Sequence, residues 1–163
     1  MNFPVMLSAS DLALLAAVQE NADLTLDQLA DRAGLSPSAV QRRLKKLRDA
    51  GVIQRTVALL DPKAVGQTLS LIVELELERD RHDLLPPLQA WIAREAAIQN
   101  AWFVTGRGDL VLSMTAASIE SFDAFMERML SDHRVIRKYT TSVVLKTLKR
   151  SLAVALEPGF RQA

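Results

Sequence analysis

The sequence predicts an α+β protein in two parts. The N-terminal part is a three-helix domain of the winged or helix-turn-helix type, and the C-terminal part is a ferredoxin-like βαββαβ domain. Two observations predict this fold class. Within the first 50 residues, apolar side chains recur at helical spacing in three capped segments. From residue 70 onward, the patterns follow the order strand, helix, strand, strand, helix, strand.

Caps indicate where the first two helices begin and end. Either Ser8 or Ser10 can cap the first helix, whose helical spacing of apolar residues fades near residue 20. Thr25 can cap a second helix over 26–33, because its hydroxyl accepts a backbone N–H that the first turn leaves unpaired. Gly34 is expected to end that helix, since glycine readily adopts the left-handed conformation found after many helices.

A third helix is expected to begin at Ser36 and Pro37. Serine caps it, and the missing proline N–H costs nothing at the first helical position. Gly51 terminates this helix, a β-rich stretch follows over 52–60, and an Asp-Pro turn and Gly66 then mark a domain boundary. The predicted division is a helix-turn-helix domain over 1–60, a linker over 61–67 and a C-terminal domain over 68–163.

The C-terminal domain is expected to alternate strands and helices. Its predicted elements are strands over 70–78, 101–105, 110–115 and 135–148 and helices over 82–96 and 118–131. In the first strand, apolar residues alternate with Glu74, Glu76 and Glu78, which predicts one buried and one acidic face. His82 and His133 lie in polar surroundings, so we expect both at the surface. Aromatic residues expected in a core or subunit interface are Trp91, Trp102, Phe103, Phe122 and Phe125.

Composition limits the classes of function. The 163 residues include no cysteine, which excludes a disulfide framework, a thiolate metal site and a cysteine nucleophile. The sequence contains no metal-ligand cluster, no phosphate-binding glycine loop and no Ser/His/Asp spacing. We therefore expect no metal, no cofactor and no enzymatic activity. The N-terminus lacks the features of a signal peptide, and no apolar run approaches bilayer length, so a cytoplasmic protein without a membrane partner is expected.

Charge is distributed unevenly along the chain, although its net value is +1. Residues 1–35 sum to −4 and residues 36–64 to +5, while the remainder is neutral. A basic block beside an acidic one is typical of a polyanion contact, although a solvated helix face has the same composition.

The segment that joins the second and third helices has the residues of a helix-turn-helix. Ala30 is the small residue needed where two crossing helices touch, and Gly34 makes the turn between them. Together these features predict a helix-turn-helix.

The third helix is expected to read double-stranded DNA with its outward face. Gln41 suits an adenine edge and Arg42 a guanine edge, because each side chain can form two hydrogen bonds in the major groove. The basic residues that follow are assigned to phosphates, where they supply salt-dependent affinity. The candidate DNA-binding residues are Ser36, Ser38, Gln41, Arg42, Arg43, Lys45, Lys46 and Arg48.

Several short motifs along the chain point to one family. They are Leu29-Ala30, residues 34–38, 42–47, 50–53 and 58–63, and Gly66. Together they resemble the Lrp/AsnC family of feast/famine transcription regulators, and the resemblance covers nearly the whole chain. It implies a sequence-specific DNA-binding regulator that responds to a small metabolite, usually an amino acid. It also implies that the C-terminal domain binds the effector and assembles the chain into dimers, and further into tetramers or octamers.

The resemblance places the effector between subunits, against the turn that joins the second and third strands. The family pattern there is close to Gly-Asp-Tyr-Asp, whereas this chain has Gly106-Arg107-Gly108-Asp109. Asp109 is expected to hold an ammonium group, and Arg107 is a cation that the family pattern lacks. A plain hairpin turn is the alternative interpretation, because glycine and aspartate are common in turns. The candidate effector-binding residues are Gly106, Arg107, Gly108, Asp109, Thr141 and Ser142.

Two other functions stay open at this point. An architectural DNA-binding protein would use the same basic helix without any ligand, and the altered turn at Arg107 and Gly108 keeps this alternative open. An enzyme similar to the haem-pathway decarboxylases would share this architecture, since fold alone does not decide function. Its chemistry would need convergent acid and base groups, which two isolated histidines do not supply. Reciprocal coupling between a ligand and DNA would identify a regulator.

Overall fold

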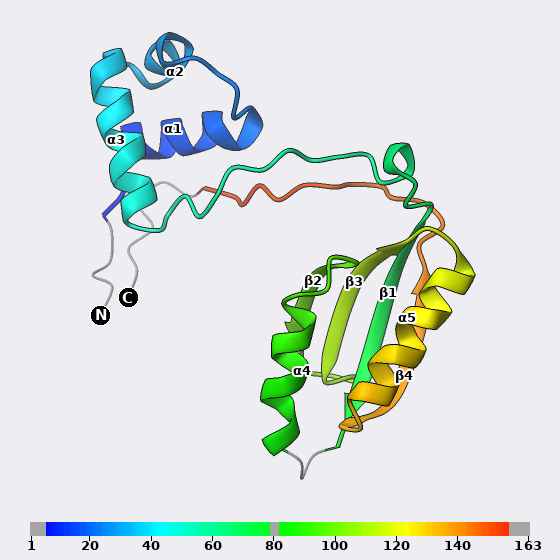
Figure 1. Cartoon of the computed structure of the whole chain (residues 1–163). Coiled ribbons are helices and arrows are strands. Elements are labelled where there is room, and N and C mark those ends of the chain that lie inside the picture. Colours follow the sequence, from blue (N-terminus) through cyan, green and yellow to red (C-terminus); the bar gives the residue numbers. More distant parts are fainter. Residues whose placement is uncertain (1–5, 79–81, 157–163) are drawn as a thin grey trace. The chain divides into compact units, whose positions relative to one another are not determined.

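The computed structural model describes residues 6–78 and 82–156, which fold into two compact units (Figure 1). Within these residues, the helical unit comprises positions up to Ala58 and from Lys149 onward, and the sheet unit runs from Leu59 to Leu148. The Gln19 side-chain amide donates to the Val154 carbonyl (3.2 Å) and accepts from the Val154 N–H (2.8 Å). These bonds attach the tail to the helical unit, whereas the predicted division at 1–60, 61–67 and 68–163 gave the tail to the C-terminal domain.

The helical unit contains the three predicted helices. They are α1 (Ala9–Glu20), α2 (Leu26–Ala33) and α3 (Pro37–Asp49). The hydroxyls of Ser8, Thr25 and Ser36 cap them, each accepting the N–H three residues further along. Gly34 follows α2 in the left-handed conformation, with φ of 63°. The buried residues that hold the three helices together are Leu14, Ala17, Leu29, Ala30, Val40 and Leu44.

The β-rich stretch over 52–60 forms no strand in the described structure. Val57 and Leu59 are more than half exposed there. A β-rich sequence becomes a strand only when a neighbouring strand pairs with its backbone, and the described part of the chain supplies no such neighbour. The last strand ends at Val143 instead of residue 148 for the same reason.

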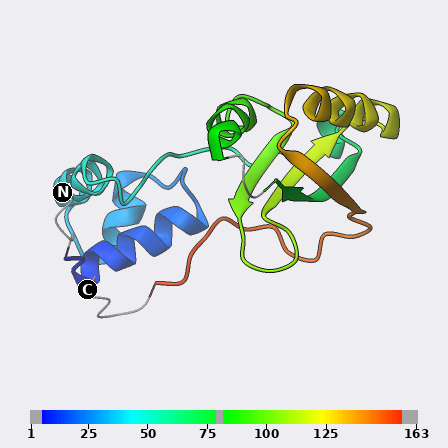
Figure 2. The same cartoon turned by 90° about the horizontal axis from the view of Figure 1, so that it is seen from below.

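The sheet unit is a four-stranded antiparallel sheet in the order β2-β3-β1-β4. Its strands are β1 (Leu69–Leu77), β2 (Ile98–Phe103), β3 (Leu110–Ala116) and β4 (Ile136–Val143). Its helices are α4 (Leu85–Ile92) and α5 (Ile119–Asp132), with short 3-10 turns η1 (Lys63–Val65) and η2 (His82–Leu84). The chain order βαββαβ confirms the predicted ferredoxin-like fold class. Both α4 and α5 lie on the same face of the sheet (Figure 2).

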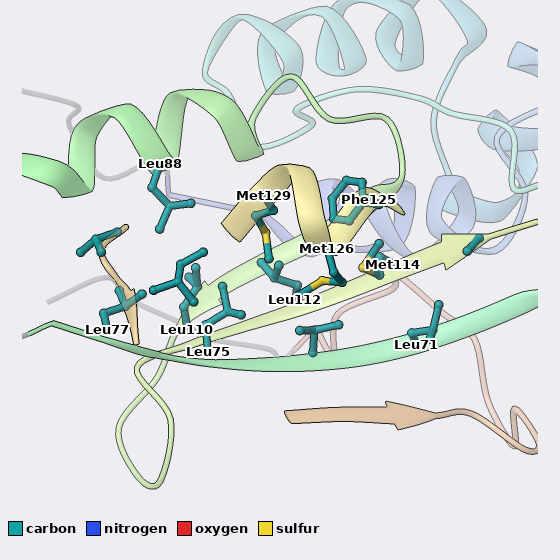
Figure 3. Packing of buried hydrophobic residues seen from close by; sticks show 14 residues of the cluster. Leu71, Leu75, Leu77, Leu88, Leu110, Leu112, Met114, Phe125, Met126 and Met129 are labelled. Atoms are coloured by element: carbon teal, nitrogen blue, oxygen red, sulfur yellow. The ribbon is translucent and has the colours of Figure 1, made fainter. Parts of the chain in front are cut away.

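The core of this unit lies between that face of the sheet and the two helices (Figure 3). Strand alternation directs the apolar residues of β1 inward, while Glu74 and Glu76 lie on the opposite, outer face. The predicted alternation is therefore confirmed. The labelled side chains that fill the core are Leu71, Leu75, Leu77, Leu88, Leu110, Leu112, Met114, Phe125, Met126 and Met129.

Three expectations for this unit were wrong. The helix expected over 82–96 ends at Ile92, and β2 begins at Ile98 instead of residue 101. Trp102 is about half exposed on the outer face, where it pairs with Val111, so of its two expected environments, a core or a subunit interface, the single chain excludes the core. His133 is only 9% exposed because its ring packs edge-on against Trp91, with centroids 5.2 Å apart. The His82 side chain lies outside the described residues.

Candidate DNA interface and ligand pocket

The third helix presents a polar, mostly basic face to solvent. Val40, Leu44 and Leu47 are buried at spacings of four and three residues, which fixes the opposite face of α3 outward. Ser36 caps the helix and its hydroxyl lies 3.2 Å from that of Ser38, so both serines lie at the helix start. The candidate residues that are exposed are Ser36, Ser38, Gln41, Arg42, Lys45, Lys46 and Arg48. Lys45 also pairs with Asp49 at 2.6 Å.

Arg43 differs from the other candidates because its guanidinium is engaged within the protein. Its Nη1 lies 2.8 Å from Oδ1 of Asp11 and 3.0 Å from the Ser8 hydroxyl. Asp11 is almost fully buried at the start of α1, so the pair ties α1 to α3. The structure therefore supports a structural role for Arg43 in place of the phosphate contact that we expected. Sequence spacing could not indicate this pair, since its members lie 32 residues apart.

The Asp11 carboxyl is stabilised in its charged form. Burial alone would raise the pKa of Asp11, but hydrogen bonds from the Ser8 hydroxyl and N–H and from Arg43 outweigh burial and lower it from 3.8. The Ser8 bonds to Oδ2 are 2.6 Å and 2.9 Å long. This residue is therefore an ionised link between α1 and α3.

A pocket of about 350 Å³ lies on the outer face of the sheet. Its residues are Glu74, Glu76, Arg107, Gly108, Lys138, Thr140 and Ser142. Glu76 pairs with Arg137 and lies 3.4 Å from Lys138. The pocket thus combines three of the predicted effector residues, Arg107, Gly108 and Ser142, with acids and bases from two neighbouring strands.

The remaining predicted effector residues are placed differently. Thr141 pairs with Val73 and therefore lies on the helix-facing side of β4, whereas Ser142 pairs with Ile72 on the outer side. These two neighbours cannot both contact one ligand on the outer face of the same chain. Oδ2 of Asp109 accepts a hydrogen bond from the Leu77 N–H (2.8 Å), so this carboxylate holds the turn to the end of β1. Gly106 sits in the turn with φ of 137°.

Sequence reasoning missed four residues of the pocket: Glu74, Glu76, Lys138 and Thr140. The alternation in β1 already placed the two glutamates on a polar face, but only the sheet order shows which neighbours share that face. β4 lies beside β1 and contributes Lys138 opposite Glu76 and Thr140 opposite Glu74. The acidic row of β1 was the one available signal.

The described residues give little support to other site types. No group of three or more His, Asp or Glu in residues 6–78 and 82–156 is arranged to hold a metal ion. Within the same ranges, no helix is long and apolar enough to cross a membrane.

The buried histidine of the sheet unit favours its neutral form. His133 Nε2 is buried without a hydrogen-bond partner among the described residues. Burial, opposed by the charge of Asp132, lowers the pKa of this histidine from 6.5.

A helix-turn-helix with an exposed basic helix, joined to a sheet unit with a ligand-sized pocket, defines a class: DNA-binding regulators with a small-molecule domain. Comparisons with known proteins support this class. Residues 7–54 match the winged helix-turn-helix DNA-binding family, and residues 70–154 match the Lrp/AsnC ligand binding domain. The chain belongs to the Lrp/AsnC family of transcription regulators, which confirms the resemblance found in its motifs.

Individual relatives match over almost their whole length. The uncharacterized HTH-type transcriptional regulator y4tD of Sinorhizobium fredii is 39% identical over 156 residues, covering 96% of this chain and 92% of its own. The leucine-responsive regulatory protein of Rhizobium meliloti is 30% identical, covering 93% and 97%. The structure of NMB0573 from Neisseria meningitidis, solved as an L-Met complex, has a TM-score of 0.86 at 29% identity, covering 92% and 97%. These comparisons indicate a transcription regulator and not an enzyme.

Proposed function

We propose that this regulator reads operator DNA with the outward face of α3 and responds to an amino acid bound at the outer face of its sheet. The observation that carries the DNA half is the exposed basic face opposite the buried Val40, Leu44 and Leu47. Gln41 and Arg42 would contact base edges, while Lys45, Lys46 and Arg48 would contact phosphates. Arg43 is left out of this contact set because Asp11 holds it.

The pocket beside the turn carries the effector half of the proposal. It includes Arg107 and Gly108 of the turn at which the resemblance to the family leads us to expect the effector, and its volume suits an amino acid. The neighbouring structure of NMB0573 was solved with L-Met. An amino acid that binds one conformation of the protein better than another would shift its affinity for DNA, and DNA would shift the affinity for the amino acid equally.

The proposal includes a dimer as the smallest functional unit. No helix among the described residues covers the outer face of the sheet, where Trp102 is exposed. Val57, Leu59, Leu145 and Leu148 are also exposed apolar residues in stretches without helix or strand. A second copy would bury such surface and would present two α3 helices to two half-sites. Sedimentation velocity on the full chain tests the dimer, and a monomer at micromolar concentration would contradict it.

The contacts of α3 are tested by selecting binding sites from random DNA with wild-type protein and Arg42→Ala. The substitution should relax preference at one or two base pairs and weaken binding to the preferred site by about 1–3 kcal/mol. A Lys46→Ala control should weaken all sequences alike and flatten the salt dependence by about one phosphate contact. Unchanged preference in Arg42→Ala would contradict base reading by Arg42.

The amino-acid response is tested by a thermal-shift screen of the full chain against the twenty amino acids. Ligand at about 100 times its dissociation constant should stabilise the protein by roughly 2.7 kcal/mol. A stabilising amino acid should then change the affinity for the selected operator. If none stabilises the protein while DNA binding is intact, the regulator does not respond to amino acids, and a ligand-independent architectural role would explain its DNA binding.

A further inference from the structure

The C-terminal tail is joined to the helical unit through one side chain of α1. The tail follows β4 and contains neither helix nor strand from residue 144 to residue 156. Its described residues from Lys149 onward belong to the helical unit. The side-chain amide of Gln19 donates to the Val154 carbonyl and accepts from the Val154 N–H, over 3.2 Å and 2.8 Å. These two bonds fix the tail backbone on the unit that contains α3.

The tail does not owe this position to its apolar side chains. Leu152 is 74% exposed and Val154 is 67% exposed, so neither buries much surface against the helices. Because burial of apolar surface is the main source of stability in a protein core, the tail adds little to the packing of the helical unit. A function for the docked tail is therefore to be sought in its charged residues.

All the charges of the described tail are positive. Residues 144–156 include Lys146, Lys149 and Arg150 and no acidic residue. All three basic side chains are exposed, and Lys149 forms no ion pair with any described residue. Lys146 belongs to the sheet unit, whereas Lys149 and Arg150 belong to the unit that carries α3. An exposed run of bases on a DNA-binding unit is typical of a phosphate contact.

The point at which the tail is attached lies beside α2. Glu20, next to Gln19, pairs with Arg32 of α2 at 2.6 Å, so the end of α1 contacts that helix. In a helix-turn-helix the second helix lies in the major groove, while the first helix crosses the backbone of the duplex. In this chain those helices are α3 and α2, respectively. The tail is therefore attached close to the helix expected to lie against DNA phosphates.

Chain length limits how far the basic residues can lie from this point. Lys149 precedes Val154 by five residues, so even a fully extended chain keeps it within about 17 Å of Val154. The major groove is about 12 Å wide and has a phosphate backbone along each side. The two distances are comparable, so the bases of the tail stay near the backbone that α2 crosses.

We infer that the docked tail is a second DNA contact, in which Lys149 and Arg150 bind phosphates beside the groove that α3 occupies. The inference rests on the proposed reading of DNA by α3 and adds a second element to it. Gln19 is the residue that positions the tail, because its amide makes both bonds to Val154. The side chains of α3 would select the sequence, whereas those of the tail would add affinity for any duplex.

Phosphate contacts from the tail have a measurable signature. Phosphates are the same in every sequence, so the tail should strengthen binding to all duplexes without changing which operator is preferred. Each phosphate that is neutralised releases condensed counterions, so the loss of one contact flattens the dependence of log K on log salt by about 0.9. At about 0.1 M salt, the same loss corresponds to roughly five- to tenfold weaker binding.

The test measures the DNA affinity of the full chain by fluorescence anisotropy over a range of salt concentrations, with a selected operator and an unrelated duplex of equal length. Lys149→Gln and Arg150→Gln should each weaken binding to both duplexes by roughly five- to tenfold at about 0.1 M salt and flatten the salt dependence by about 0.9. Arg150→Lys keeps the charge and should retain the wild-type salt dependence. Gln19→Ala removes both bonds to Val154 and should also weaken binding to both duplexes.

Arg134→Gln is the matched control, because it removes one exposed positive charge from the sheet unit and should leave the salt dependence unchanged. An unchanged salt dependence in both Lys149→Gln and Arg150→Gln, together with a flattened one in Lys46→Ala, would overturn the tail contact and leave DNA reading by α3 standing. A change of sedimentation coefficient in Lys149→Gln would also overturn it, because the tail would then act in assembly. If Arg42→Ala and Lys46→Ala leave DNA binding unaltered as well, the proposed reading by α3 fails, and this inference with it.

Discussion

The ion pair between Asp11 and Arg43 should stabilise the helical unit, and Asp11→Asn is the substitution that tests this. Asparagine keeps the shape of the side chain and one carbonyl oxygen, but it removes the charge that binds Nη1 of Arg43 at 2.8 Å. It also weakens the capping box, in which the Ser8 N–H and hydroxyl donate to Oδ2. The substitution thus affects the start of α1 and its link to α3 together.

The expected loss is about 2 kcal/mol. Breaking a fully buried pair costs about 3–5 kcal/mol, whereas a fully exposed pair contributes about 0–1 kcal/mol. The side chain of Asp11 is 12% exposed and that of Arg43 is 33% exposed, so this pair lies between the two limits. A weakened cap contributes within the same range. In a double-mutant cycle with Arg43→Gln, about 1 kcal/mol or more of this loss should appear as coupling energy.

Hydrogen exchange of backbone amides measures this effect locally, because Trp91 and Trp102 belong to the sheet unit and do not report on the helices. Amides of α1 and α3 should exchange about 30-fold faster in Asp11→Asn, while those of the sheet unit should not change. If the losses of stability in Asp11→Asn and Arg43→Gln simply add up in the double variant, the pair is not a stabilising contact. Arg43→Gln should also leave the salt dependence of DNA binding unchanged. A salt dependence flattened as much as in Lys46→Ala would show that Arg43 contacts a phosphate.

The same pair predicts the direction of acid sensitivity. Because the pKa of Asp11 is lower in the folded protein than its ordinary 3.8, the unfolded chain binds the proton more tightly. The stabilisation is complete above pH 3.8 and is lost as the pH falls through the lowered folded value. Asp11→Asn should remove this component of the acid unfolding of α1 and α3, and an identical acid profile in both proteins would contradict it.

Three further predictions concern His133, the Asp109 turn and the core of the helical unit. Burial lowers the pKa of His133 from 6.5, so the sheet unit should lose stability as the pH falls below 6.5. The melting temperature of His133→Gln should therefore depend less on pH between pH 7.5 and 5.5 than that of the wild type, and an equal pH dependence in both proteins would contradict this. Asp109→Ala leaves the Leu77 N–H without its acceptor and should lower the free energy of unfolding of the sheet unit by about 1–3 kcal/mol. Urea unfolding followed by tryptophan fluorescence measures this loss, and an unchanged free energy would show that the hydrogen bond does not stabilise the turn. Leu14→Ala opens a cavity at a fully buried position and should destabilise the helical unit by about 2–5 kcal/mol, measured by hydrogen exchange of the amides of α1 and α3. Unchanged exchange in these helices would contradict this.

Local features of the fold could be predicted because their causes lie within a few residues. Each of the caps at Thr25 and Ser36 needs only a hydroxyl three residues before the N–H it accepts. Gly34 ends α2 because its own backbone reaches the left-handed conformation. The order βαββαβ followed from the alternation in β1 and the helical spacing in α5. The exposed face of α3 was equally predictable, since helical periodicity alone places Arg42 opposite Val40 and Leu44.

The fine structure of both sites depended on contacts between residues far apart in the chain. Spacing within α3 cannot show that Asp11, 32 residues earlier, binds the guanidinium of Arg43. Likewise, only the pairing of β4 with β1 separates Thr141 from Ser142 and brings Lys138 and Thr140 to the pocket.

The sequence by itself determined the order of the helices and strands, the caps at Thr25 and Ser36, and that the chain is an Lrp/AsnC regulator. The tertiary structure decided which polar side chains are available to a ligand and which are already bound within the protein. The physical reason is range. Caps and periodicities act over three or four residues, whereas ion pairs and strand registers such as Glu76 opposite Lys138 form only after distant segments have packed together.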